Sequence, residues 1–343
     1  MHMADALISP AVGGAMWAAT AVTTVYCAKK VREDLDDRKV PLMGVVGAFI
    51  FAAQMLNFTI PATGSSGHLG GGLILTVLLG PHAAFLVMAS VLSVQALFFA
   101  DGGLLALGAN VFNLGFFPAF VAYPLIYKKI VGGDPTRAKL FTGSLLAAVV
   151  ALQLGAFGVV SETTLSGISE LPFGTFVAMM QPIHLGIGIV EGFVTAAVVL
   201  FVQRTQPELL TRVAERKRLA SLNLKPVLAG LLVVAILSGG VLSWLASTNP
   251  DGLEWSIEKV TGSEELAGTT AGVHGTSAEI QKKTSFLPDY GFKQSAETEE
   301  GDVAGSAGTS VAGIVGAAIT LALVVLVGFI LRRRSIANAS PGI

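Results

Sequence analysis

Residues 309–334 read TSVAGIVGAAITLALVVLVGFILRRR, a long uncharged run that ends in three consecutive arginines. About 20 consecutive apolar residues are enough for a helix to cross a bilayer. Lys and Arg collect on the cytoplasmic side of such helices. The stretch therefore predicts a membrane-spanning helix whose C-terminal end faces the cytoplasm.

Similar apolar runs recur along the 343 residues, of which 52% are hydrophobic and only 13% are charged. An ordinary globular domain carries about 25% charged residues. The runs predict an all-α polytopic membrane protein with nine helices, at about 10–28, 40–58, 68–79, 82–100, 104–127, 139–160, 175–202, 226–246 and 309–331.

The basic residues indicate how these helices are oriented. They follow the first, fifth, seventh and ninth predicted helices, at positions 29–39, 128–139, 204–225 and 332–334. The remaining four of the 22 lie between positions 247 and 308. Since cytoplasmic loops collect Lys and Arg, we expect a multi-pass protein of the cell (inner or plasma) membrane, with its N-terminus outside and its C-terminus in the cytoplasm. No basic stretch precedes the first run, so we expect no cleavable signal peptide.

The chain divides into two parts. We expect residues 1–222 to form a seven-helix domain, and residues 223–343 to form an accessory unit of two helices around an external loop, 247–308. That loop carries eleven Asp and Glu against four Lys. It is either a solvated spacer or a segment that attracts cations, and we expect its histidine, His274, to be solvated.

The outer loops of the first part are predicted to contain acidic residues but no Lys or Arg. These acidic residues are Asp5, Asp101, Glu162 and Glu170. A mouth with only negative charges would concentrate cations there.

The N-terminus offers metal chemistry. The amine of Met1, the next backbone nitrogen and the imidazole of His2 can chelate one metal in a five-membered and a six-membered ring. Ni(II) and Cu(II) accept such tetragonal nitrogen fields. His68, in a glycine-rich loop on the same predicted side, is the natural fourth donor. A second residue that happens to be His and a solvated loop His are the ordinary alternatives.

Other polar residues in or beside the apolar runs are expected to support the bundle. His184 and Glu191 lie two turns apart on one helical face. Intramembrane ionisable groups face a bundle interior, so these two are read as structural support or as part of a conduction path. The remaining members of this group are Asn57, Ser66, Asn110 and Asn113.

Several chemistries are excluded. The single cysteine, Cys27, rules out an intrachain disulfide framework and a multi-cysteine metal site. The sequence contains no GxxxxGK[ST] loop, no HExxH and no GxSxG. We therefore expect neither ATP hydrolysis by this route nor another enzymatic activity, and we expect no cofactor and no nucleic-acid partner.

Four segments carry a family resemblance: MH at the start, NFTIPATGSSGHLGGG at 57–72, NVFNLGFFPAF at 110–120 and HLGIGIVEGFVTA at 184–196. They resemble the substrate-specific membrane components of energy-coupling-factor nickel and cobalt transporters, the NikM/CbiM family. NPDGLEWS at 249–256 resembles the start of their PDGLE-type, NikN-like accessory component, here fused in one chain. At the start, Met3, Ala4 and Ala6 depart from the expected Ile, Pro and Gly.

The resemblance implies a seven-helix component whose external N-terminus inserts into the bundle, with a near-planar site made by Met1, His2 and His68. It also implies a separate membrane coupling subunit and two cytoplasmic ATPases. The transported substrate is expected to be Ni(II), with Co(II) as the alternative. Another class remains open, a self-sufficient ion-coupled carrier or channel with Glu191 and His184 on its pathway.

Overall fold

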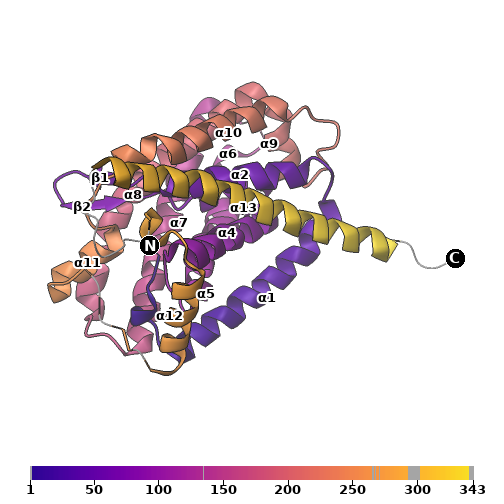
Figure 1. The fold of residues 1–343 in the computed structure, drawn as a ribbon. Coiled ribbons are helices and arrows are strands. Elements are labelled where there is room, and N and C mark those ends of the chain that lie inside the picture. The colour runs from indigo at the N-terminus through magenta and orange to yellow at the C-terminus, as the bar shows by residue number, and fades with distance from the viewer. Residues whose placement is uncertain are drawn as a thin grey trace.

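The computed structural model describes residues 2–133, 135–264, 266, 268–269, 271–292 and 302–339, with only the backbone at 34, 302–306 and 334–339. The described chain is mostly helical (Figure 1). The longer helices are α1 (Pro10–Asp34), α2 (Lys39–Gln54), α4 (Pro81–Val94), α7 (Arg137–Ser166), α8 (Phe173–Thr205), α10 (Lys225–Gly240), α11 (Gly252–Thr261), α12 (Gly272–Thr284) and α13 (Asp302–Ala339). The shorter ones are α3 (Gly72–Leu79), α5 (Leu107–Val111), α6 (Lys128–Val131) and α9 (Pro207–Ala214).

Six helical segments in the described part are long and apolar enough to cross a membrane. They are 10–33, 81–99, 107–131, 137–166, 173–205 and 307–333. Two shorter apolar helices, α2 and α10, accompany them. A multi-pass membrane protein is therefore confirmed, whereas the division into seven plus two helices and the orientation of the termini stay predictions.

Apolar side chains cover the outside of the longest helices. Large exposed examples are Val22 on α1, Leu146 on α7, Phe193 on α8 and Leu326 on α13. Water-soluble monomers rarely expose broad apolar surfaces, whereas a helix bundle in lipid tails meets an equally apolar solvent. The exposed side chains therefore suit a surrounding bilayer.

The last helix runs back across the first part of the chain. Helix α13 packs along α2, with α10 beside both, and Figure 1 shows it crossing the bundle before it projects beyond it. The helices come close where glycines remove side chains: Gly313 lies against the backbone of Gly239. Small residues allow this close approach between helices in membranes.

One predicted helix begins later than expected. The segment expected at 68–79 starts with a loop that follows a hairpin, and helix α3 begins only at Gly72. Strands β1 (Phe58–Ile60) and β2 (Ser65–Gly67) pair antiparallel, with Thr59 opposite Ser66. The turn contains Gly64 at φ 76°, a conformation that glycine adopts without strain.

The helix that precedes Asp101 ends in a widened turn. After α4, residues Gln95–Phe99 form a short π-helical segment, η2, and Ala100 then adopts φ 58°. A second π-helical segment, η3 (Phe112–Tyr127), joins α5 to α6 and contains Pro118 and Pro124. Such widened turns are often found at functional sites, and η2 delivers the chain directly to Asp101.

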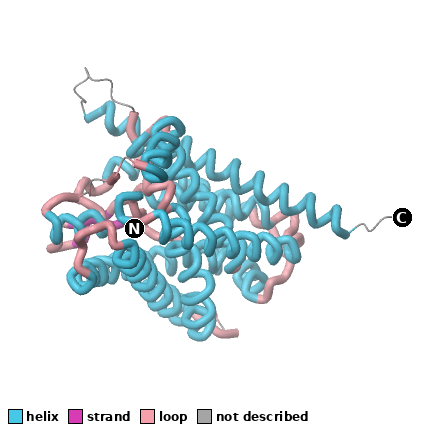
Figure 2. Tube along the Cα trace, turned by 90° about the horizontal axis from the view of Figure 1, so that it is seen from below, coloured by secondary structure: helices cyan, strands magenta, loops and turns pink. Residues whose placement is uncertain are grey.

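Hairpin β1–β2, helices α11 and α12 and the N-terminus gather at one end of the bundle. Helix α9 lies toward the other end, and the C-terminus beyond it (Figure 1). Loops also concentrate at these ends when the molecule is seen from below (Figure 2). The acidic segment 247–308 is therefore not simply a solvated spacer: within its described part it folds into helices that pack over the N-terminus.

Candidate metal centre

The N-terminal segment is buried in the bundle. The side chains of Met3, Leu7 and Ile8 are at most 2% exposed. The short 3₁₀ turn η1 (Asp5–Leu7) follows, and the Asp5 carboxylate accepts a hydrogen bond from the Ala106 amide at 2.9 Å. These contacts hold the second residue of the chain at a fixed place.

Asn110 secures this segment next to His2. Its Oδ1 accepts from the Met3 amide at 2.8 Å, and its Nδ2 donates to the Met3 carbonyl at 3.1 Å. The Gly103 amide donates to the same carbonyl at 3.0 Å. An asparagine predicted to support the bundle therefore lies where it can position the N-terminal donor.

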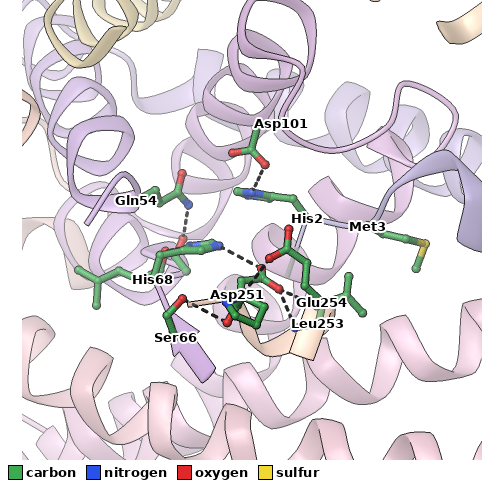
Figure 3. Close-up of polar contacts among 12 residues, drawn as sticks. His2, Met3, Gln54, Ser66, His68, Asp101, Asp251, Leu253 and Glu254 are labelled. Carbon is green, nitrogen blue, oxygen red and sulfur yellow. Dashed lines mark hydrogen bonds and ion pairs between the residues drawn. The ribbon is translucent and has the colours of Figure 1, made fainter. Parts of the chain in front are cut away.

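His2 and His68 face each other as a stacked pair. Their ring centroids are 4.9 Å apart and their planes differ by 23°. Nδ1 of His2 lies 2.8 Å from Oδ1 of Asp101, and Figure 3 marks this contact with a dashed line. Its Nε2 is buried and makes no hydrogen bond within the described part of the chain. Two imidazoles from residues 66 positions apart thus meet at one point.

His68 presents one ring nitrogen for coordination. Its Nδ1 lies 3.0 Å from the Leu69 carbonyl, so Nδ1 carries the proton and Nε2 keeps the lone pair. Burial, aided by the nearby His2, lowers the pKa of His68 to about 3. His68 is therefore neutral at physiological pH, the form that binds metals.

Glu191 and Gln54 fix the loop that follows His68. Both carboxylate oxygens of Glu191 accept backbone amides, from Gly70 at 2.6 Å and from Gly71 at 3.1 Å. Nε2 of Gln54 donates to the Gly70 carbonyl at 2.9 Å. A buried carboxylate that is fully hydrogen-bonded in this way orders the backbone beside it.

Asp101 joins His2 to the accessory unit. Its Oδ2 accepts from the Tyr290 hydroxyl at 2.5 Å. Burial alone would raise the pKa of Asp101, but the charge and hydrogen bond of His2, together with Tyr290, lower it to about 2. Asp101 is therefore ionised, and it holds the His2 ring in its present orientation through Nδ1.

The accessory unit reaches the hairpin that carries His68. The Ser247 amide donates to the Asn57 carbonyl at 2.8 Å, and the Ser66 amide donates to the Pro250 carbonyl at 2.8 Å. The Ser66 hydroxyl also donates to the Asn249 carbonyl at 2.8 Å. Segment 247–250 therefore lies along the hairpin and is fixed there by backbone hydrogen bonds.

His274, on helix α12, contacts the N-terminal segment at Ile8. Its Nε2 lies 3.0 Å from the Ile8 carbonyl, and the residue is 7% exposed. The expectation that this histidine is solvated is therefore wrong. Because α12 folds back over the N-terminus, a histidine far away in the sequence is buried there.

A large cavity opens beside the imidazole pair. It has a volume of about 1190 Å³, and residues of both parts of the chain line it, among them His2 and His68. Its acidic lining residues are Asp5, Asp101, Asp251, Glu254, Glu279 and Asp289, beside one lysine, Lys282. Because the negative charges outnumber the positive one, the cavity favours cations.

Some predicted residues lie elsewhere. Asn113 donates to Glu162 at 2.8 Å, and Glu162 is buried in the last turns of α7 rather than in an outer loop as expected. Nδ1 of His184 lies 2.8 Å from the Met180 carbonyl. Met1 lies outside the described residues. In the part that the structure describes, no three His, Cys, Asp or Glu side chains are grouped to hold a metal.

Asp251 and Tyr290 also lie beside the site, and neither was predicted to do so. Asp251 carries a local signal, because the pattern Asp-x-x-Glu that it begins is typical of a capped helix start. That signal identifies the helix but does not indicate where the helix points. Tyr290 has no comparable signal.

Comparison with known proteins adds two family matches. A profile described as "Cobalt uptake substrate-specific transmembrane region" matches residues 2–209, and one described as "PDGLE domain" matches residues 225–333. The fused nickel transport protein NikMN of Rhodobacter capsulatus is 32% identical over 315 residues, covering 84% of this chain and 88% of that protein.

Shorter relatives match the first part. The cobalt transport protein CbiM of Sorangium cellulosum is 31% identical, covering 62% of this chain and 95% of that protein. A crystal structure of a transition metal transporter aligns with a TM-score of 0.53 and 32% identity, covering 60% of this chain and 93% of that one.

Proposed function

The chain belongs to the family of cobalt uptake substrate-specific transmembrane regions and carries a PDGLE domain behind it, and from this membership we propose that it is the substrate-binding membrane component of an energy-coupling-factor importer that captures Ni(II) outside the cell. Metal transport as such follows from the family and its relatives. Nickel as the cargo, the type of importer and the residues that hold the ion are parts of the proposal.

The observation that carries the proposal is the imidazole pair. His2 and His68 stack at 4.9 Å, and each has a ring nitrogen whose lone pair can face an ion. The Met1 amine and the His2 backbone nitrogen would supply the other two donors. Ni(II) is well stabilised by four nitrogen donors in a plane, whereas Co(II) is stabilised less by this coordination geometry.

Loading the chelate requires a change at His2. The six-membered ring of the chelate uses Nδ1 of the imidazole, and in the structure this atom lies 2.8 Å from Asp101. The metal and Asp101 therefore compete for Nδ1. The ring must turn as the ion binds, and the free Asp101 carboxylate would then face a site that has gained positive charge.

The cavity suits capture from dilute solution. Its acidic lining concentrates divalent cations beside the site, and on the predicted orientation it opens to the outside. His2 and His68 lie at its wall. The cavity would thus attract the cation first, and the nitrogen donors would then coordinate it.

Energy must come from partners. The sequence contains no phosphate-binding loop, and importers of this class take energy from two cytoplasmic ATPases through a membrane coupling subunit. We therefore propose these three subunits as partners, with a reorientation of the binding component that releases the metal inward. Residues 1–222 form the binding domain and residues 223–343 the accessory unit, a division supported by the interval between the two matched ranges.

Isothermal titration of the purified full chain with Ni(II) and Co(II) tests the binding site. We expect His2→Ala and His68→Ala each to abolish stoichiometric nickel binding. His82→Ala is the matched control, because His82 contacts Tyr26 and Phe120 rather than the imidazole pair. Nickel binding that survives His68→Ala would exclude the proposed centre.

Transport in liposomes tests the partnership. The chain alone should bind nickel without accumulating it, and accumulation should require the ATPases and ATP. Accumulation by the chain alone would instead favour a self-sufficient carrier. The structure gives that alternative little support, because both oxygens of Glu191 already accept backbone amides.

A further inference from the structure

The accessory unit places a carboxylate beside His68. Helix α11 begins at Gly252, and its N-cap residue is Asp251. Oδ1 of Asp251 accepts the amides of Leu253 at 2.7 Å and Glu254 at 2.9 Å. The Glu254 carboxylate accepts the Asp251 amide in return, at 2.8 Å. This capping box fixes the direction of the Asp251 side chain.

The other carboxylate oxygen faces the imidazole pair. Oδ2 of Asp251 lies 4.0 Å from Nε2 of His68, the nitrogen that keeps its lone pair, and Figure 3 shows the two side chains pointing toward each other. A metal lies about 2.0–2.2 Å from imidazole nitrogen or carboxylate oxygen. The separation thus leaves room for a cation between the two groups.

Each imidazole therefore has its own acidic neighbour. Asp101 lies against His2, and Asp251 lies against His68. Two backbone amides donate to Oδ1 of Asp251, and such hydrogen bonds favour the charged form of a carboxylate.

The Asp251 carboxylate can balance the positive charge of a bound metal. A divalent ion bound by two neutral imidazoles, a neutral amine and one deprotonated amide keeps a net positive charge. A buried charge without an opposite partner is strongly destabilising. Asp251 is only 16% exposed, so little water screens its attraction for such an ion.

A small cavity continues from the same place. It has a volume of about 10 Å³, and His68, His184, Asp251 and Gly252 help to line it. Nε2 of His184 is fully buried and makes no hydrogen bond within the described part of the chain. His184 of helix α8 and Asp251 of the accessory unit therefore meet at one small cavity beside His68.

We propose that Asp251, supplied by the accessory unit, belongs to the metal centre: its carboxylate faces the cation held at His68 and offsets its charge. The binding site of the first part is then completed by the second. This inference rests on the proposed function, and the hydrogen bonds between segment 247–250 and the hairpin keep Asp251 beside His68.

Asp251→Asn separates this task from helix capping. Asparagine is as good an N-cap as aspartate, so the variant keeps α11 but loses the charge. We expect its nickel affinity to fall 10- to 100-fold, the usual effect of losing a supporting carboxylate at a metal site, with an unchanged melting temperature. Asp251→Ser, another uncharged cap, should behave in the same way and replaces the asparagine variant should that one not fold.

Glu258→Gln is the matched control. It removes one negative charge from the same helix, where Glu258 lies next to Lys259, and its nickel affinity should stay within twofold of the wild type. Asp251→Glu should regain part of the lost affinity, because it restores the charge.

Wild-type affinity in folded Asp251→Asn, or an equal loss in Glu258→Gln, would overturn the inference. Both variants are titrated in the full chain beside His68→Ala. If His68→Ala still binds nickel, the proposed function itself fails. If His68→Ala loses nickel while Asp251→Asn binds as the wild type does, only the role of Asp251 is rejected.

Discussion

Asn110 and Met3 are joined by two hydrogen bonds, one in each direction. Asn110 accepts from the Met3 amide at 2.8 Å and donates to its carbonyl at 3.1 Å. The side chain of Asn110 thus takes the place that a neighbouring strand would take in a sheet. Because His2 directly precedes Met3, this pair determines where the N-terminal imidazole lies.

Asn110→Leu should release the N-terminal segment. The change keeps the branched shape of the side chain but leaves the buried Met3 amide without an acceptor, which costs about 1–3 kcal/mol. The Met3 carbonyl keeps the Gly103 amide as its donor. We expect hydrogen exchange at residues 3–7 to become faster and nickel affinity to fall at least tenfold. Asn113→Leu is the control: it removes a buried asparagine that pairs with Glu162, and it should leave exchange at residues 3–7 unchanged.

His274→Ala should loosen the same segment from the accessory side. It removes the contact between His274 and the Ile8 carbonyl at 3.0 Å. A typical hydrogen bond contributes about 1 kcal/mol, which corresponds to a loss of about fivefold in nickel affinity. Titration with nickel checks this, and an affinity equal to that of the wild type would show that the contact does not support the site.

Gly71→Ala should disturb the loop behind His68. Gly71 adopts φ 76°, and a Cβ at this position would lie 2.8 Å from the Ile50 side chain. Gly64 also adopts φ 76° but has open space around it. Gly71→Ala and Gly64→Ala both impose about 1–2 kcal/mol of backbone strain. The melting temperature that Gly71→Ala loses beyond Gly64→Ala therefore measures the steric clash with Ile50. Equal melting temperatures for the two variants would contradict this account.

The helices could be predicted from the sequence because long apolar runs leave few alternatives in a membrane. The imidazole pair could also be expected, since the chelate chemistry of a second-position histidine is local. The structure brings His2 and His68 together, while the coordination of a metal by them stays a prediction.

The carboxylates around the pair could not be predicted. Asp251 lies 183 positions from His68 in the chain, and Tyr290 contacts Asp101 across 189 positions. Such contacts depend on how the accessory unit folds over the bundle, and no local pattern encodes that. Glu162 was misplaced for a related reason: a charge usually ends an apolar run, but here Asn113 pairs with it inside the bundle.

Acidification should destabilise the fold through His68. Its pKa is about 3 in the folded chain, against an ordinary value of about 6.5 in the unfolded chain. As the pH falls below 6.5, the unfolded chain therefore takes up a proton that the folded chain does not. The contribution of His68 to the free energy of unfolding is complete above pH 6.5. It falls by up to about 1.4 kcal/mol per pH unit as the pH drops toward 3.

The measurement is the melting temperature of the wild type and of His68→Gln in detergent between pH 7.5 and 4.5. The wild type should lose more stability than the variant across this range. Parallel curves for the two proteins would mean that His68 is protonated as easily in the folded chain as in the unfolded one.

Four extra residues ahead of Met1 should abolish nickel binding as completely as His2→Ala does. The extension turns the Met1 amine into an amide and moves the free amine too far from His2 to share a chelate with it, although both imidazoles remain. Titration of the extended chain with Ni(II) measures the loss, and a four-residue extension at the C-terminus is the control. Since the cavity beside His2 and His68 has a volume of about 1190 Å³, the added residues have space and need not unfold the segment. Stoichiometric nickel binding by the N-terminally extended chain would show that no free amine next to His2 is needed to hold the ion, which would remove the α-amino group from the site.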